Sequence, residues 1–379
     1  MSLEIAVEPV SRRFNVKRNE SAEESFQKAL ADDFAATETV YVGRPRDVML
    51  NSRAEVLGRY KLTTSALSQL CSRLAPGASQ LVSDVSGLRS SGDGKQLDVS
   101  LGIRIVNDLI RLRFEQVDGF GLIIDRERAT VEGLVGRKYQ FFPNKELYDR
   151  VNQFLDESDI STSFCEAVLA GRRMLLRYCN NDPLFEIPHE KRTNEPFFGG
   201  YHFDNSESGH CSVRASTMVV RQWCDNKAIG SFLEGGKMSH VRGKKFEIRL
   251  QALFDKVSRK VEEITNLKDN VLFLMDQNLG LGGSEQSHEF RVGGLVKQLN
   301  RKGLTKEFSG VVINRLLTFG SYRSDAIQQG RRPYDLYETR NSYDLFNALT
   351  HEAKSRPIDI REQVEQLAYQ MLLRQFEIK

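Results

Sequence analysis

The sequence has little that would stabilise a fold covalently or anchor it in a membrane. Only five of its 379 residues are cysteine, and no two form a Cys-x-x-Cys pair; they are Cys71, Cys165, Cys179, Cys211 and Cys224. Scattered cysteines in odd number argue against a disulfide framework, so we expect reduced thiols. No run approaches the roughly 20 apolar residues of a membrane helix, and the N-terminus lacks the apolar core of a signal peptide. We therefore expect a cytoplasmic protein with no membrane partner.

The chain also lacks a strong net charge. Its 54 Lys and Arg residues against 51 Asp and Glu give +3, which is too little to indicate a nucleic-acid partner from bulk charge. The charges are unevenly distributed, however. Residues 20–33 are acidic, whereas residues 104–113, 171–177 and 237–260 are basic. With 40% hydrophobic and 28% charged residues, the composition is that of a globular protein, and we expect one with an asymmetric charge distribution.

The pattern of apolar residues predicts an α+β fold. Alternation and turn residues predict strands at 119–124, 130–135, 172–178, 200–203 and 211–220, with a polar hairpin turn at 204–209. Helical spacing predicts helices near 62–74, 103–112, 145–155 and 250–264, and then at 295–299, 310–317, 343–353 and 360–376. We expect an antiparallel sheet core packed with helices, followed by a mainly helical C-terminal region.

Composition shifts predict four segments. Residues 1–40 are expected to be a flexible acidic arm with one short helix near 22–35. Residues 41–276 form the predicted α+β core domain. The cluster Gly280, Gly282 and Gly283 marks a Gly-rich linker at 277–287, and residues 288–379 form the helical C-terminal region.

Several residue groups imitate cofactor or metal sites without meeting their requirements. Gly230, Gly235, Gly236 and Lys237 suggest a phosphate-binding loop, but the first glycine falls one position early and Met238 replaces the required hydroxyl. We interpret the Gly-Gly-Lys segment as a turn. The possible ligands between His202 and Cys224 match no standard zinc spacing. We expect no cofactor and no metal.

One catalytic alternative remains open. Cys224, Asn226 and His240 contain the residue types of a nucleophilic site, although no local signature accompanies them. A buried structural cysteine is the simpler interpretation of Cys224.

Basic residues that recur beside aromatic residues favour an anion-binding surface. The densest stretch is 220–245, which includes Trp223, the only tryptophan. Arginines and lysines neutralise backbone phosphates, and aromatic rings stack on bases. The candidate nucleic-acid-binding residues are Arg137, Lys138, Tyr139, Arg172, Arg173, Arg221, Trp223, Arg242, Lys244 and Lys245. On alternating strands half of such side chains face the core, so phosphate contact by the arginines is the safer part of this prediction.

The same residues carry a family resemblance. The segments Val135-Gly-Arg-Lys-Tyr139, Ala170-Gly-Arg-Arg173 and Val219-Val-Arg-Gln-Trp-Cys-Asp-Asn226, together with His240, resemble the phage- and plasmid-encoded family labelled domain of unknown function 932. The resemblance extends over about residues 40 to 379. The chain departs from the family pattern where Lys227 follows Asn226 and Val241 follows His240. The resemblance implies a mobile-element protein that resides in the bacterial host cytoplasm, and it implies no particular activity.

Together these observations predict a non-enzymatic protein that binds single-stranded DNA. Annealing of complementary single strands is one activity that proteins of this class have. We expect the protein to form a homo-oligomer and to act in recombination or replication of a phage or plasmid. Two alternatives remain. One is an enzyme that processes nucleic acid or nucleotides with Cys224 and His240, and the other is an interaction protein that binds a host protein through its acidic arm and C-terminal helices.

Overall fold

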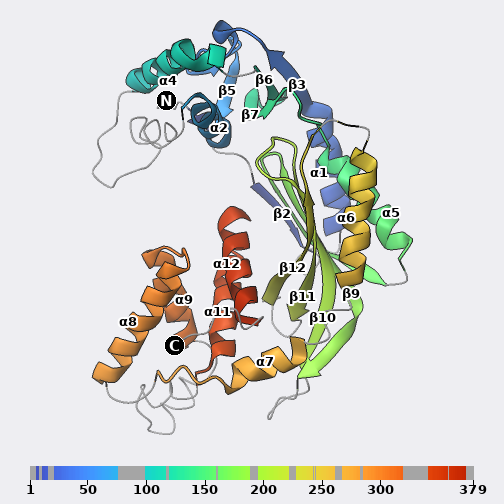
Figure 1. The fold of residues 1–379 in the computed structure, drawn as a ribbon, viewed down its shortest axis with the longest axis vertical. Coiled ribbons are helices and arrows are strands. Elements are labelled where there is room, and N and C mark those ends of the chain that lie inside the picture. Colours follow the sequence, from blue (N-terminus) through green and yellow to red (C-terminus); the bar gives the residue numbers. More distant parts are fainter. Residues whose placement is uncertain are drawn as a thin grey trace.

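Two six-stranded sheets and a set of C-terminal helices make up the molecule (Figure 1). The structure is a computed structural model. It describes residues 6–7, 11–15, 21–75, 99–116, 119–158, 161–187, 195–221, 228–241, 243, 245–260, 267–281, 285–318, 340–356 and 358–372. The first sheet forms one arm, the second sheet lies in the middle, and the C-terminal helices form the other arm.

Sheet A, in the first arm, has the strand order β1-β5-β7-β6-β3, with β4 paired to β5. Its strands are β1 (Ala6–Val7), β3 (Thr37–Val42), β4 (Glu55–Val56), β5 (Tyr60–Thr63), β6 (Phe120–Asp125) and β7 (Thr130–Gly136). Both β1 and β7 run parallel to β5, and the other pairs are antiparallel. Sheet A is therefore mixed.

Two helices complete this arm, α2 (Thr64–Leu74) and α4 (Val99–Arg113). The start of α2 follows from the sequence, because the Thr63 hydroxyl accepts a hydrogen bond from the backbone N–H of Ala66 at 3.2 Å. Leu70 of α2 and Ile110 of α4 are buried against sheet A. A buried side chain of this size contributes about 1.5–3 kcal/mol. A short 3₁₀ helix precedes α2 (η1, Pro45–Asp47) and another follows α4 (η2, Phe114–Gln116).

Sheet B has the strand order β12-β11-β10-β9-β8-β2 and is antiparallel throughout. Its strands are β2 (Ser11–Asn15), β8 (Thr162–Ala170), β9 (Arg173–Ile187), β10 (Glu195–Ser206), β11 (Val213–Arg221) and β12 (Ala228–Met238). Three helices cover one face, α1 (Ala22–Ala36), α5 (Asn144–Asp156) and α6 (Phe246–Lys260) (Figure 1). Phe26, Leu147 and Phe254 from these helices pack in one core with residues of the sheet.

The C-terminal helices lie against the other face and one end of sheet B (Figure 1). They are α7 (Leu267–Asp276), α8 (Glu285–Arg301), α9 (Lys306–Thr318), α11 (Ser342–Ala353) and α12 (Ile358–Leu372). A capping box between Asn341 and Asp344 begins α11. Their core includes Ile187 and Phe197 from β9 and β10, so these helices are continuous with sheet B.

The predicted fold class is confirmed, but the segment boundaries differ. The described part of the predicted arm is integrated into the fold, because β2 pairs with β8 and Phe26 of α1 is fully buried. The predicted core domain contains two sheets with separate hydrophobic cores. In the predicted linker, Leu281 is buried and the N–H of Leu279 donates to the carbonyl of Arg340 at 2.8 Å. The described part of the predicted linker therefore packs against the C-terminal helical region.

The predicted turn at Gly235-Gly236-Lys237 is wrong, because these residues belong to β12. The register of β11 and β12 shifts between Ala215 and Ser216, which shows an irregularity where the glycines occur. Glycine has a low strand propensity, so the strand signal in the sequence is weak here. Pairing with β11 nevertheless places these residues in a strand. The four described cysteines are free thiols, as expected. Within the described ranges, no helix is long and apolar enough to span a membrane.

Candidate nucleic-acid interface

The structure brings together two of the predicted basic segments that are about 100 residues apart in sequence. After β7, Arg137 and Lys138 form an exposed turn, and Tyr139 pairs with Val241 in an isolated β-bridge. The backbone N–H of Gln140 also donates to the carbonyl of His240 at 2.9 Å. The 137–138 turn therefore lies beside the segment that leads into α6. We call the exposed side chains of Arg137, Lys138 and Lys245 the basic shoulder.

Tyr139 holds this arrangement in place. Its hydroxyl donates to the carbonyl of Ser206 at 2.9 Å and lies 2.6 Å from Nδ1 of His240. Burial raises the pKa of the Tyr139 phenol and lowers the pKa of His240 to about 4, so both side chains are neutral near pH 7. Tyr139 therefore fixes the loops of the shoulder. Its hydroxyl is used internally, in contrast to the predicted role of a base-stacking group.

No carboxylate of the described ranges pairs with the basic shoulder. Among the described residues, none forms an ion pair with Arg137, Lys138 or Lys245. The neighbouring acid Glu247 pairs with Arg150 at 3.2 Å. The positive charge of the shoulder is thus available to an external anion. Arg242 and Lys244, which belong to the same predicted group, lie outside the described residues.

Arg172 is placed differently from its prediction, because it lies inside the protein. Its side chain is 1% exposed; Nη2 donates to Asp125 at 2.7 Å and Nη1 donates to the carbonyl of Asp33 at 2.6 Å. Glu207 lies 3.8 Å from the same guanidinium. Asp33 lies in the last turn of α1, Asp125 ends β6, and Glu207 lies in the turn after β10, so the three partners come from the region where sheet A meets sheet B. Arg172 therefore joins the two sheets and is not available to a phosphate.

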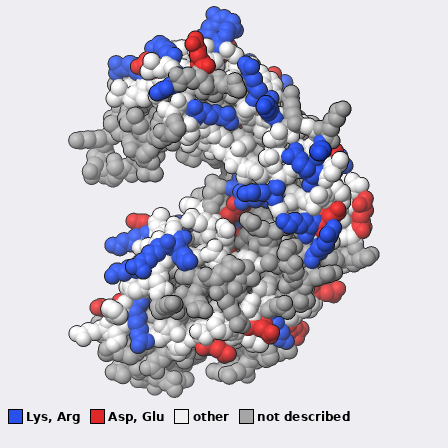
Figure 2. All heavy atoms as spheres, in the orientation of Figure 1, with Lys and Arg blue, Asp and Glu red and all other residues white. Residues whose placement is uncertain are grey.

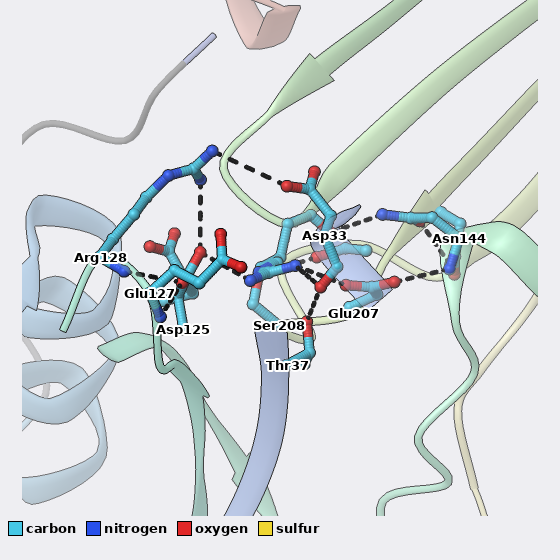
Figure 3. A network of polar contacts seen from close by, with 12 residues as sticks. Asp33, Thr37, Asp125, Glu127, Arg128, Asn144, Glu207 and Ser208 are labelled. Atoms are coloured by element: carbon cyan, nitrogen blue, oxygen red, sulfur yellow. Dashed lines mark hydrogen bonds and ion pairs between the residues drawn. The ribbon is translucent and has the colours of Figure 1, made fainter. Parts of the chain in front are cut away.

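A wider polar network surrounds this junction (Figure 3). Arg128 lies between Asp33 and Asp125 at 3.7 and 3.4 Å, and the backbone N–H of Asn144 donates to Glu207 at 2.7 Å. Burial raises the pKa of Glu207 to about 7, and this effect exceeds the opposing effect of Arg172. One carboxylate oxygen of Glu207 and Nε of Arg172 are buried without a hydrogen-bond partner among the described residues. The hydrogen-bonding capacity of this network is therefore only partly used by the described residues.

Arg173 is also buried and paired, and it faces the C-terminal helices. Its guanidinium contacts Asp204 of β10 at 2.8 Å and Glu362 of α12 at 2.6 Å. Arg172 lies in the turn between β8 and β9, whereas Arg173 is the first residue of β9, and the two neighbours enter different networks. We therefore do not retain Arg173 as a phosphate contact.

A second buried network lies beside Arg173. Arg361 of α12 binds Glu166 of β8 in a bidentate pair at 2.7 and 3.0 Å, and Arg177 of β9 binds Glu365 at 2.5 Å. Arg361 and Glu365 also pair within α12 at 2.8 Å. These arginines hold the pKa of Glu166 well below its usual range, despite burial. We did not predict this network, although the i, i+4 spacing of Arg361 and Glu365 was a visible signal.

The remaining predicted residues do not join the shoulder. Arg221 ends β11, whereas the shoulder lies near the beginning of that strand, about 26 Å away for a nine-residue strand. Trp223 lies outside the described residues, as do Cys224 and Asn226 of the catalytic alternative. His240 is 6% exposed and is held by Tyr139. In the described part of the chain, no group of three His, Cys, Asp or Glu residues could hold a metal ion.

Comparisons with known proteins do not extend this description. No protein-family model, no curated protein and no solved structure matches the chain. The resemblance to the domain of unknown function 932 family therefore stays a prediction.

Proposed function

We propose that the protein is a non-enzymatic single-stranded DNA-binding protein that contacts phosphates through the basic shoulder. The observation that carries this proposal is the convergence of Arg137, Lys138 and Lys245 through the Tyr139–Val241 bridge. Three exposed cations that form no ion pair within the described part of the chain suit a phosphodiester backbone, whose charges repeat along the strand. We further propose that the protein acts as a homo-oligomer in phage or plasmid recombination or replication, as the family resemblance implies.

Other exposed Lys and Arg side chains form an alternative surface for contact with DNA phosphates. Figure 2 shows a hollow between the arm of sheet A and the arm of C-terminal helices, with Lys and Arg side chains on both arms. Arg301, Lys302 and Lys306, where α8 meets α9, are also exposed. A test of the shoulder must therefore include this second group.

The test is fluorescence anisotropy with a labelled single strand and the matching duplex, titrated at several salt concentrations. The triple variant Arg137→Ala/Lys138→Ala/Lys245→Ala should weaken binding and reduce the slope of log affinity against log salt by about 2, since each single-strand phosphate contact contributes about 0.7. The matched control is Arg301→Ala/Lys302→Ala/Lys306→Ala, which removes the same charge and should keep the slope. Light scattering of the same samples reports the oligomer.

Two results would overturn the proposal. Absence of binding at low salt would exclude single-stranded DNA as the partner. Loss of the salt slope in the control variant alone would move the contact from the shoulder to the α8–α9 turn.

A further inference from the structure

A pocket on the other side of sheet B has no role in the proposed function. It lies between α12 and strands β10 to β12 and has a volume of about 130 Å³. Its polar lining consists of His202, Arg214, Ser216, Lys237, Glu362 and Gln366. An engineered cavity of about 150 Å³ accommodates benzene, so this volume suffices for one small chemical group. Lys237 and Gln366 are exposed, which opens the pocket to solvent.

The charge pattern of this pocket is unusual. Arg214 of β11 and Lys237 of β12 are directly opposite each other in the strand register. Like charges in this position destabilise a sheet unless an anion lies between them. Arg214 has partial compensation from Asp204 and Glu362, each at 3.5 Å. Lys237 forms no ion pair with any described residue. One positive charge at the pocket is therefore uncompensated.

Neutral donors complete the lining. The Ser216 side chain is 7% exposed, and neither its hydroxyl nor the Gln366 amide has a hydrogen-bond partner within the described ranges. Behind them, Arg173 is fixed by Asp204 and Glu362 and adds to the positive field. Two cations with a hydroxyl and an amide offer several donors around a small volume, which suits an anion that has several acceptor oxygens.

We propose that this pocket binds a phosphate group, with Lys237 and Arg214 as its charged contacts and Ser216 and Gln366 as its neutral donors. A phosphate is anionic near pH 7 and carries three or more strong acceptor oxygens, so it suits the donors and the one uncompensated positive charge. The phosphate belongs either to free inorganic phosphate or to a phosphate ester. The inference does not depend on DNA binding, because the basic shoulder and this pocket share no residue.

The test is isothermal titration calorimetry of the full chain in chloride buffer, with inorganic phosphate in one titration and a 5′-mononucleotide in another. Lys237→Met should weaken phosphate binding roughly tenfold or more, the effect of losing one charge-assisted hydrogen bond. Because Lys237 is exposed and unpaired in the described structure, the variant should fold normally, as circular dichroism will check.

Lys256→Met is the matched control. Lys256 is an exposed lysine of α6, and its side chain lies within 4.0 Å of where a Cβ of Gly236 would be, on the face of sheet B opposite the pocket. This variant loses the same charge close to the same strand and should bind phosphate like the parent.

The outcomes separate clearly. Equal affinity for the two ligands indicates that the pocket takes the phosphate group alone, and tighter binding of the mononucleotide indicates a phosphate ester. Absence of heat with both ligands at millimolar concentration overturns the proposal. Equal weakening in Lys237→Met and Lys256→Met also overturns it, because it would show an effect of overall charge.

Discussion

Sheet B is joined to its neighbours by two buried ionic networks that differ in completeness. The sheet junction consists of Asp33, Asp125, Arg172 and Glu207 and connects sheet A to sheet B. The helix junction consists of Glu166, Arg177, Arg361 and Glu365 and connects α12 to sheet B. All of the ion pairs in the helix junction are 3.2 Å or shorter, whereas the pair between Arg172 and Glu207 is 3.8 Å.

The difference lies in how the carboxylates respond to burial. In the helix junction, the arginines outweigh burial and lower the pKa of Glu166. In the sheet junction, burial outweighs Arg172 and raises the pKa of Glu207 to about 7. A buried charge is favourable only when it is fully paired. The helix junction should therefore be the stronger attachment, and the sheet junction should respond to pH.

The largest expected effect comes from breaking the helix junction. Arg361→Met removes the bidentate partner of Glu166 and one partner of Glu365, and both carboxylates stay buried. We expect the free energy of unfolding to fall by about 3–5 kcal/mol in urea denaturation. Arg301→Met, which removes an exposed arginine of α8, should change it by less than about 0.5 kcal/mol. A loss below about 1 kcal/mol in Arg361→Met would contradict the strength assigned to this junction.

A smaller effect should follow from forcing sheet A away from sheet B. Gly133 of β7 packs directly on the turn between β10 and β11, and a Cβ at this position would lie 2.4 Å from Cβ of Ser208 and 2.7 Å from its carbonyl oxygen. Gly133→Ala should therefore destabilise the protein by about 1–3 kcal/mol in thermal unfolding. Gly136→Ala on the same strand is the control, because a Cβ there would meet nothing within 4 Å. Equal effects of the two substitutions would show that the close approach has no energetic importance.

A third expected effect is the pH dependence that Glu207 contributes at the sheet junction. Because the folded-state pKa of Glu207 is about 7, above the ordinary value of 4.5, its contribution to stability is complete below pH 4.5 and is lost as pH rises through 7. Glu207→Gln keeps a carbonyl oxygen for the N–H of Asn144 and cannot ionise. We expect parent and variant to have similar free energies of unfolding near pH 4.5, with the variant favoured at pH 8. A constant difference at both pH values would exclude Glu207 as the titrating group.

Local signals predicted much of the fold. The Thr63 cap, the leucine spacing of α2 and the alternation in β7 and β11 each specify their own element, and the structure confirms them. The strands that no local signal predicted are β1 to β5, β8 and β12. β8 carries the charged Glu166 at a buried position, and β12 contains three glycines, so tertiary pairing decides both.

The candidate site was predicted only in part, because residue type does not reveal a side chain's partner. Arg137 and Arg172 both lie in Arg-rich motifs, yet Arg137 is exposed and Arg172 is buried among carboxylates. The groups around the Arg172 guanidinium come from three distant segments of the chain: the backbone carbonyl of Asp33 and the carboxylates of Asp125 and Glu207. The same limit hid the pocket at Lys237, since the like charges of Arg214 and Lys237 face each other only in the strand register of β11 and β12, which shifts one residue further on.

The pairing of Glu166 with Arg361, 195 residues later, also dictates an order of events during synthesis. Most of sheet B leaves the ribosome well before α12 is made, and until then Glu166 lacks its bidentate partner. Contacts of such long sequence separation slow folding, and incompletely covered sheet surfaces favour aggregation. The ion pairing of Glu166 in sheet B is therefore completed only when the last described helix docks and brings Arg361 against it.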